Sequence, residues 1–192
     1  MITEIYPLIE RIKIALSDCK ISTIAIDIVE MTEKNKLEEC VDTFENIILT
    51  KNKKLYSSVF TGIQCLVFMK ENYNQDVSFE KFFSSIKYLD IEYSKTLWIH
   101  LTPLLRQPFF ATEKAQRYIA LSINKCIDIY ENLADQGERY YLDGLYNCVE
   151  ALHQYYKSVK TTGTGETDEL KQCVEKARKI KNYEIANIWS YE

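Results

Sequence analysis

Glu150 and His153 form the one pair of side chains in this sequence whose spacing matches a metal-binding motif. Carboxylate-bridged di-iron bundles place a Glu and a His three residues apart on each of two helices, with both side chains directed into the bundle core. A second pair is missing, because the only other histidine, His100, has Leu97 three residues before it. We therefore predict neither a metal nor a cofactor, and we interpret His153 as a hydrogen-bonding residue at the surface or between helices.

Six cysteines are the next candidates for chemistry. They lie far apart and include no C-x-x-C pair, so the sequence indicates neither a zinc site nor a disulfide framework. Five of them precede Val, Leu or Ile on the apolar stripe of an expected helix: Cys40, Cys65, Cys126, Cys148 and Cys173. Because a catalytic thiol must be partly exposed and activated, we predict buried, reduced thiols with a structural role.

The sequence favours a protein that is not an enzyme. One enzymatic alternative stays open, in which Glu150, His153 and a cysteine meet in a cleft of an all-α fold. Gly163, Thr164 and Gly165 do not form a phosphate-binding loop, which would need a preceding strand, a third glycine and a Lys-Ser or Lys-Thr ending. We predict instead that residues 161–167 form a flexible loop before the last helix.

The elements that would position these residues are helices. Five glycines and three prolines separate long stretches in which apolar residues recur at helical spacing, which predicts an all-α fold of about eight helices. The expected ranges are 2–18, 22–34, 37–50, 56–71, 78–93, 112–134, 138–160 and a last helix that begins at 167. The Ile-rich range 22–34 also permits a short strand. Around Pro103 and Pro108 we expect short helical pieces or a wrapped loop.

Three details of these helices concern their ends and their packing. Thr112 and Thr167 are expected to cap the helices that follow them. Gly62 is expected to allow another helix to approach closely rather than to break its own helix. The candidate interior positions of the helix at 112–134 are Tyr118, Leu121, Ile123, Cys126, Ile129 and Leu133.

The chain is expected to form a single helical domain over residues 1–192, because it is long enough for one core and contains no long linker. Its helices are predicted to pack as antiparallel hairpins. The six cysteines, five of them followed by an aliphatic residue, recur at intervals of 21 to 25 residues, with one longer gap. A short α-solenoid would show such intervals, but so would an irregular bundle, and both architectures stay open.

Charge and hydropathy exclude two classes of partner. The longest apolar stretches, such as that around Trp98, are far shorter than the roughly 20 residues of a membrane helix. Charged residues interrupt the N-terminus, unlike a secretory signal, so we expect a cytoplasmic protein with no membrane partner. A net charge of −4 and only small basic clusters argue against nucleic-acid binding.

Acidic residues concentrate in two stretches that predict two acidic ridges. The first ridge consists of Glu38, Asp42 and Glu45 on one helical face, and the second of Asp128, Glu131, Asp135 and Glu138. The solvated face that every amphipathic helix needs would explain both ridges. The functional interpretation is a surface for a basic protein partner.

Tyrosine provides the second indication of a partner. The helix at 138–160 carries five tyrosines: Tyr140, Tyr141, Tyr146, Tyr155 and Tyr156. Adjacent residues point about 100° apart on a helix, so some of these rings must lie outside the core, where tyrosine is favoured at interfaces. We assign Tyr140, Tyr141 and Tyr155 to a partner surface. A chain encoded by AT-rich DNA would also be rich in tyrosine, and this alternative stays open.

These features favour a protein–protein interaction module. The specific form that we expect is an inhibitor of the immunity or antitoxin type that covers a basic partner such as a nuclease toxin. Such proteins are small, and complementary charge gives them fast capture of their target. A helical adaptor or scaffold fits the same features.

Overall fold

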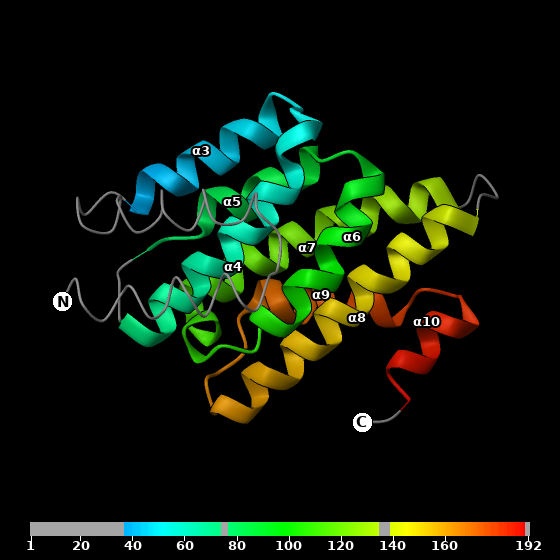
Figure 1. Cartoon of the computed structure of the whole chain (residues 1–192). Coiled ribbons are helices and arrows are strands. Elements are labelled where there is room, and N and C mark those ends of the chain that lie inside the picture. Colours follow the sequence, from blue (N-terminus) through cyan, green and yellow to red (C-terminus); the bar gives the residue numbers. More distant parts are fainter. Residues whose placement is uncertain (1–36, 74–76, 135–138, 191–192) are drawn as a thin grey trace. The chain divides into compact units, whose positions relative to one another are not determined.

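The computed structural model describes residues 37–73, 77–134 and 139–190 (Figure 1). Within these ranges every regular element is a helix, which confirms the all-α fold class. The expected helices at 2–18 and 22–34 lie outside the described residues. The contacts group into two compact units, Met1–Phe82 and Phe83–Glu192, so the single domain over the whole chain stays a prediction.

The first unit contains a helical hairpin. Helix α3 (Leu37–Leu49) leads through the short η1 (Lys53–Leu55) into α4 (Tyr56–Tyr73). The ring of Phe44 in α3 packs so closely on Gly62 that a methyl group at Gly62 would fall within 3 Å of three ring atoms. Since α4 runs unbroken through Gly62, the predicted close helix approach is confirmed.

The second unit begins within α5 and consists of helices around a central pair. Its elements are α5 (Glu80–Ser85), η2 (Ile86–Tyr88), α6 (Ile91–Leu104), η3 (Pro108–Ala111), α7 (Glu113–Ala134), α8 (Arg139–Thr162), α9 (Asp168–Arg178) and α10 (Tyr183–Ile188). Helix α8 packs on α6, α7, α9 and α10, and α7 also packs on α9, η2 and η3. Because α7, α8 and α9 all contact one another, their packing is that of a bundle.

The long helices α7 and α8 form an antiparallel hairpin and run side by side in Figure 1. The Tyr155 hydroxyl, late in α8, donates to the carbonyl of Phe110, just before α7, at 2.7 Å. Early in α8, a methyl group at Gly144 would meet the ring of Tyr130, late in α7, at 2.5 Å. This glycine therefore lets the two backbones approach closely where the hairpin begins.

The single helix predicted for residues 78–93 is wrong. The chain instead forms α5 and η2, and a new helix begins at Ile91. Leu89 and Asp90 have extended ψ angles of 144° and 139°, which interrupts the helix and makes Asp90 the N-cap residue of α6. Helix α6 also includes Pro103, where we expected short pieces or a loop. It ends one residue later, so the proline removes a backbone hydrogen bond only in the last turn.

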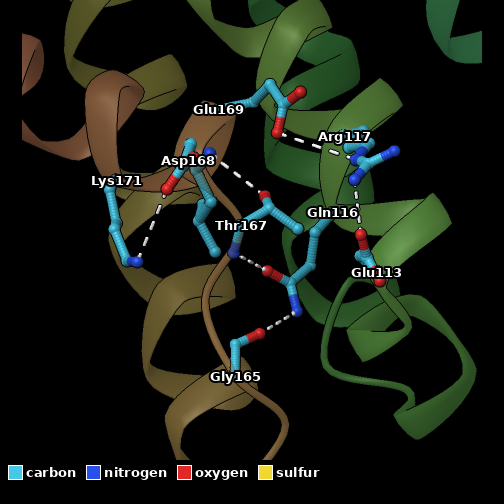
Figure 2. A network of polar contacts seen from close by, with 9 residues as sticks. Glu113, Gln116, Arg117, Gly165, Thr167, Asp168, Glu169 and Lys171 are labelled. Atoms are coloured by element: carbon cyan, nitrogen blue, oxygen red, sulfur yellow. Dashed lines mark hydrogen bonds and ion pairs between the residues drawn. The ribbon is translucent and has the colours of Figure 1, made fainter.

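A buried glutamine fastens the start of α9 to α7 (Figure 2). The Gln116 amide nitrogen donates to the carbonyls of Ala111 and Gly165 at 2.8 and 2.9 Å, and its oxygen accepts the N–H of Thr167 at 2.9 Å. The Thr167 side chain accepts the N–H of Leu170, as predicted for an N-cap. Helix α8 extends to Thr162, so the connection to α9 is shorter than the 161–167 loop that we expected.

In the described ranges, no helix combines the length and the apolar character that spanning a membrane requires.

Candidate protein-binding face

Glu150 and His153 do not form a joint site. The Glu150 carboxylate accepts a hydrogen bond from the Gln154 amide at 2.8 Å, and the Gln154 oxygen accepts one from Arg106 at 2.9 Å. His153 is buried, with its ring edge-on to Trp189 at a centroid distance of 4.9 Å. Among the described residues, no group of three His, Cys, Asp or Glu side chains is placed to hold a metal ion.

The cysteines of the described ranges are free and buried, as predicted, whereas Cys19 lies outside these ranges. Burial raises the pKa of Cys65 to about 11 and that of Cys173 to about 12. Burial and the neighbouring Cys126 thiol also raise the pKa of Cys148 well above its ordinary value. These three thiols are therefore protonated at neutral pH and are poor nucleophiles, so they lend no support to the enzymatic alternative.

The first acidic ridge is engaged within its own unit. The Glu38 carboxylate accepts the N–H of Ser78 at 2.7 Å, and Asp42 pairs with Lys81 at 2.6 Å. The hydrogen bond and the charge of Asp42, with smaller contributions from Glu45 and Glu38, raise the pKa of Lys81. Glu38 thus attaches α3 to the segment before α5, and Asp42 attaches it to α5 itself, where Lys81 neutralises part of its charge.

The described residues of the second acidic ridge, Asp128 and Glu131, lie where α7 packs on α9. Asp128 forms an ion pair with Lys176, whose ammonium also donates to Asn124 at 3.1 Å. Glu131 is half-buried and borders an open pocket of about 300 Å³. The other lining residues come from α9 and carry both signs of charge: Gln172, Glu175, Lys176 and Lys179. Asp135 and Glu138 lie outside the described residues.

The predicted tyrosines of α8 lie in different environments. Tyr141 is half-buried, and of Tyr140 only its place in the helix is described. Tyr155 is completely buried and is hydrogen-bonded to the η3 backbone, so it does not belong to a partner surface. Tyr156 is buried too. Among the rings whose burial the structure describes, Tyr146 is exposed and Tyr141 half-buried, so some of these rings do lie outside the core, as expected. Tyr155 and Tyr156 are both buried because α6, α7, α9 and α10 all pack on α8, which buries more than one side of it.

The outer surface of α7 presents an apolar residue that the sequence led us to expect inside. Leu121 is 50% exposed. On one side of Leu121, α7 contacts α9. The Arg117 guanidinium lies 3.8 Å from the Glu169 carboxylate, and Lys176 contacts both Asn124 and Asp128. On the other side, α7 contacts the segment leading into η2, through Ser122 and Tyr118: the Ser122 hydroxyl donates to the Phe83 carbonyl at 2.7 Å. Leu121 therefore lies between two rows of interhelical contacts, on the solvent-exposed side of α7.

A second large side chain is exposed on the η2 side of Leu121. Tyr88 is 49% exposed, and the Lys87 ammonium lies 4.7 Å from the centroid of its ring. Lys125 lies one turn after Leu121 on α7, and the influence of Lys87 lowers its pKa. We use the name α7 face for the surface formed by these residues and by those where α7 packs on α9: Lys87, Tyr88, Leu121, Lys125, Asp128, Glu131, Glu175, Lys176 and Lys179.

The sequence contained the signal that places Leu121 outside. Ile119 and Ile123 are both fully buried, and Leu121 lies two residues from each. Two residues correspond to about 200° around a helix, so a side chain between two buried neighbours at this spacing points away from the core. Leu121 was nevertheless predicted to be an interior residue. It lies three residues after Tyr118 and five residues before Cys126, and these spacings match a helical repeat only approximately.

Comparison with protein families, with characterised proteins and with solved structures finds no significant match. The function proposed below therefore depends on the geometry of the α7 face.

Proposed function

We propose that this protein is a helical protein-binding module and that the α7 face is its binding surface. The observation that carries the proposal is the exposure of Leu121 and Tyr88 among charged side chains of both signs. Protein interfaces combine an apolar, often aromatic centre with a polar rim, and a Leu and a Tyr that are each half-exposed can supply that centre.

The charge pattern of the face describes the kind of partner. Lys87 and Lys125 lie on its η2 side, whereas the side toward α9 has mixed charge, with Asp128, Glu131 and Glu175 beside Lys176 and Lys179. A partner with matching patches of opposite sign would be oriented by this division, since complementary potentials fix the register of an interface.

An inhibitor of the immunity or antitoxin type is the specific form of this proposal that the sequence favours. Its support is the pair of carboxylates Glu131 and Glu175, which would meet a basic protein such as a nuclease, although Lys176 and Lys179 line the same pocket. Pairing of Asp128 with Lys176 reduces the acidity available for such a partner. A helical adaptor whose partner has mixed charge fits the α7 face better.

A matched pair of substitutions tests the binding surface. Leu121 and Ile99 are exposed to nearly the same extent, 50% and 53%. Ile99 belongs to α6, which packs on α8, and is not part of the α7 face, so it serves as the control. We expect Leu121→Asp to reduce retention of a stoichiometric partner from native extracts at least tenfold, and Ile99→Asp to leave it unchanged. Equal retention by both variants would exclude the α7 face as the binding surface. If the retained partner is a nuclease, an equimolar amount of this protein should abolish its activity.

A further inference from the structure

The turn between α3 and α4 exposes every side chain from Leu49 to Leu55, at the end of the hairpin in the first unit (Figure 1). We use the name hairpin tip for residues 49–55, which include the last residue of α3 and all of η1. Leu49 is 49% exposed and Leu55 is 40% exposed. Three of the residues between them are lysines: Lys51, Lys53 and Lys54. The hairpin tip therefore presents two apolar side chains beside three cationic ones.

Backbone hydrogen bonds fix the shape of the hairpin tip. The N–H of Lys51 donates to the carbonyl of Ile48 at 3.0 Å, and the N–H of Asn52 donates to that of Ile47 at 3.1 Å. These two bonds close the end of α3 in a Schellman motif. Further along, the N–H of Leu55 donates to the carbonyl of Asn52 at 3.0 Å. The exposed leucines and lysines therefore extend from an ordered backbone.

Lys51 occupies a backbone conformation that favours glycine. Its φ angle is 53°, and no other residue except glycine has a positive φ in the described part of the chain. Glycine is usual at this position of the motif, because a Cβ atom is strained there. Lysines after the end of a helix stabilise its dipole, but this explains neither the strained conformation of Lys51 nor the exposed leucines on both sides of it. Strain that is kept in this way is typical of functional positions.

The hairpin tip lies in a part of the sequence without acidic residues. Residues 46–70 contain four lysines and no Asp or Glu, although the whole chain has 28 acidic and 24 basic residues. Lys51 and Lys54 form no ion pair with any carboxylate that the structure describes. Their charge is therefore available to an anionic partner.

We propose that the hairpin tip docks on the surface of a membrane that contains anionic phospholipids, separately from the protein contacts of the α7 face. The lysines would lie among the lipid phosphates, and the leucines would reach the boundary with the acyl chains. A stable protein interface has about 20–30 residues on each side, far more than the hairpin tip offers, whereas a turn at the end of a hairpin can meet a flat lipid surface. The contact does not cross the bilayer, so the sequence features that argued against a membrane partner do not bear on it.

Sedimentation of the full-length protein with lipid vesicles tests this proposal. One set of vesicles contains equal parts of phosphatidylserine and phosphatidylcholine, and the other contains phosphatidylcholine alone. Each lysine near an anionic surface strengthens binding about fivefold, so we expect saturable binding to the first set and at least about tenfold weaker binding to the second. High salt should weaken the binding, since it screens exposed charges. A polyglutamate peptide forms a second arm: binding to the peptide but not to the vesicles would overturn the proposal in favour of an acidic protein partner.

Lys51→Gly separates membrane binding from folding. Glycine relieves the strain at positive φ, so this variant should melt at a higher temperature than the native protein and yet bind anionic vesicles about fivefold more weakly. The double variant Leu49→Ser, Leu55→Ser should weaken binding at least about tenfold. As controls, Ile99→Ser in α6 and Lys157→Gln in α8 alter exposed residues outside the hairpin tip and should have no effect. Equal binding to both sets of vesicles, or tip variants that bind as well as these controls, would overturn the proposal.

Discussion

The side-chain oxygen of Gln116 accepts the backbone N–H of Thr167 at 2.9 Å, across 51 residues of chain. The same amide donates to the carbonyl of Gly165 (Figure 2) and to that of Ala111. Thr167 is the N-cap residue of α9, so a single buried side chain in α7 determines where α9 begins. Since α9 supplies one side of the α7 face, Gln116 indirectly positions Glu175 and Lys179.

Replacing Gln116 by leucine should therefore be strongly destabilising. The substitution keeps most of the side-chain volume but leaves the buried Thr167 N–H and Ala111 carbonyl without their partner, and each unsatisfied buried group costs about 1–3 kcal/mol. We expect a loss of about 3 kcal/mol in the free energy of unfolding, measured by urea denaturation. Gln172→Leu, at an exposed position of α9, is the control and should change stability by less than about 0.5 kcal/mol. A loss below about 1 kcal/mol for Gln116→Leu would show that the network does not fasten α9.

Gly144→Ala tests the close approach of α7 and α8. Alanine favours a helix over glycine by about 1 kcal/mol, but its methyl group would meet the Tyr130 ring at 2.5 Å. Because overpacking of a core costs about 1–3 kcal/mol, we expect a net loss of stability in thermal denaturation. Gly165→Ala is the matched control, since a methyl group there meets no atom within 4 Å. An equal melting temperature for both variants would contradict the close packing.

Local signals in the sequence predicted much of this fold. The fold class, the α3–α4 hairpin with its contact at Gly62, the range of α7 and the N-cap at Thr167 all followed from helical spacing and capping residues. These features depend on residues close together in the chain, which is why the sequence alone revealed them.

The errors arose where packing between distant segments decides the structure. Helical spacing ran on through Leu89 and Asp90, although the chain turns there to begin α6. Tyr155 was assigned to a partner surface because adjacent tyrosines point about 100° apart, but it is buried and its hydroxyl donates to the η3 backbone. The lysine partners of Asp42 and Asp128 are 39 and 48 residues away, so no local pattern indicates that these acids are paired.

The ion pair of Asp128 and Lys176 changes what a charge reversal should do. If Asp128 belonged only to a solvated partner surface, Asp128→Lys would weaken partner binding without affecting stability. In the structure it places a second ammonium group beside Lys176, so we expect a loss of about 1 kcal/mol, which Lys176→Glu should restore in the double variant. Chemical denaturation of the two single variants and the double variant measures this coupling. Strictly additive effects would mean that the pair contributes nothing in solution.

Stability should fall at alkaline pH because of the buried thiols. Burial raises the pKa of Cys65 to about 11 in the folded protein, whereas the unfolded chain releases this proton near its ordinary value of 9.0. Above that value the unfolded state binds fewer protons, so the free energy of unfolding decreases by up to about 1.4 kcal/mol per pH unit until pH approaches 11. Below about pH 8 this contribution is constant.

Cys65→Ala isolates this effect from the titration of lysines and tyrosines. The variant should be less stable than the native protein at pH 7, because it leaves a small cavity. Between pH 7 and pH 10.5 the difference should shrink by about 2 kcal/mol, since only the native protein has a Cys65 thiol to titrate. A difference that stays constant over this range would show that Cys65 is not buried in solution.

The central claim is that the α7 face binds another protein, and site-specific photocrosslinking in native cells tests it most directly. A photoreactive amino acid at position 121 is compared with the same group at position 99, where the native side chain is equally exposed. We expect one crosslinked partner from position 121, lost when Glu131→Lys is added, and none from position 99. No crosslink at position 121, or the same products from both positions, would contradict the α7 face as a protein-binding surface.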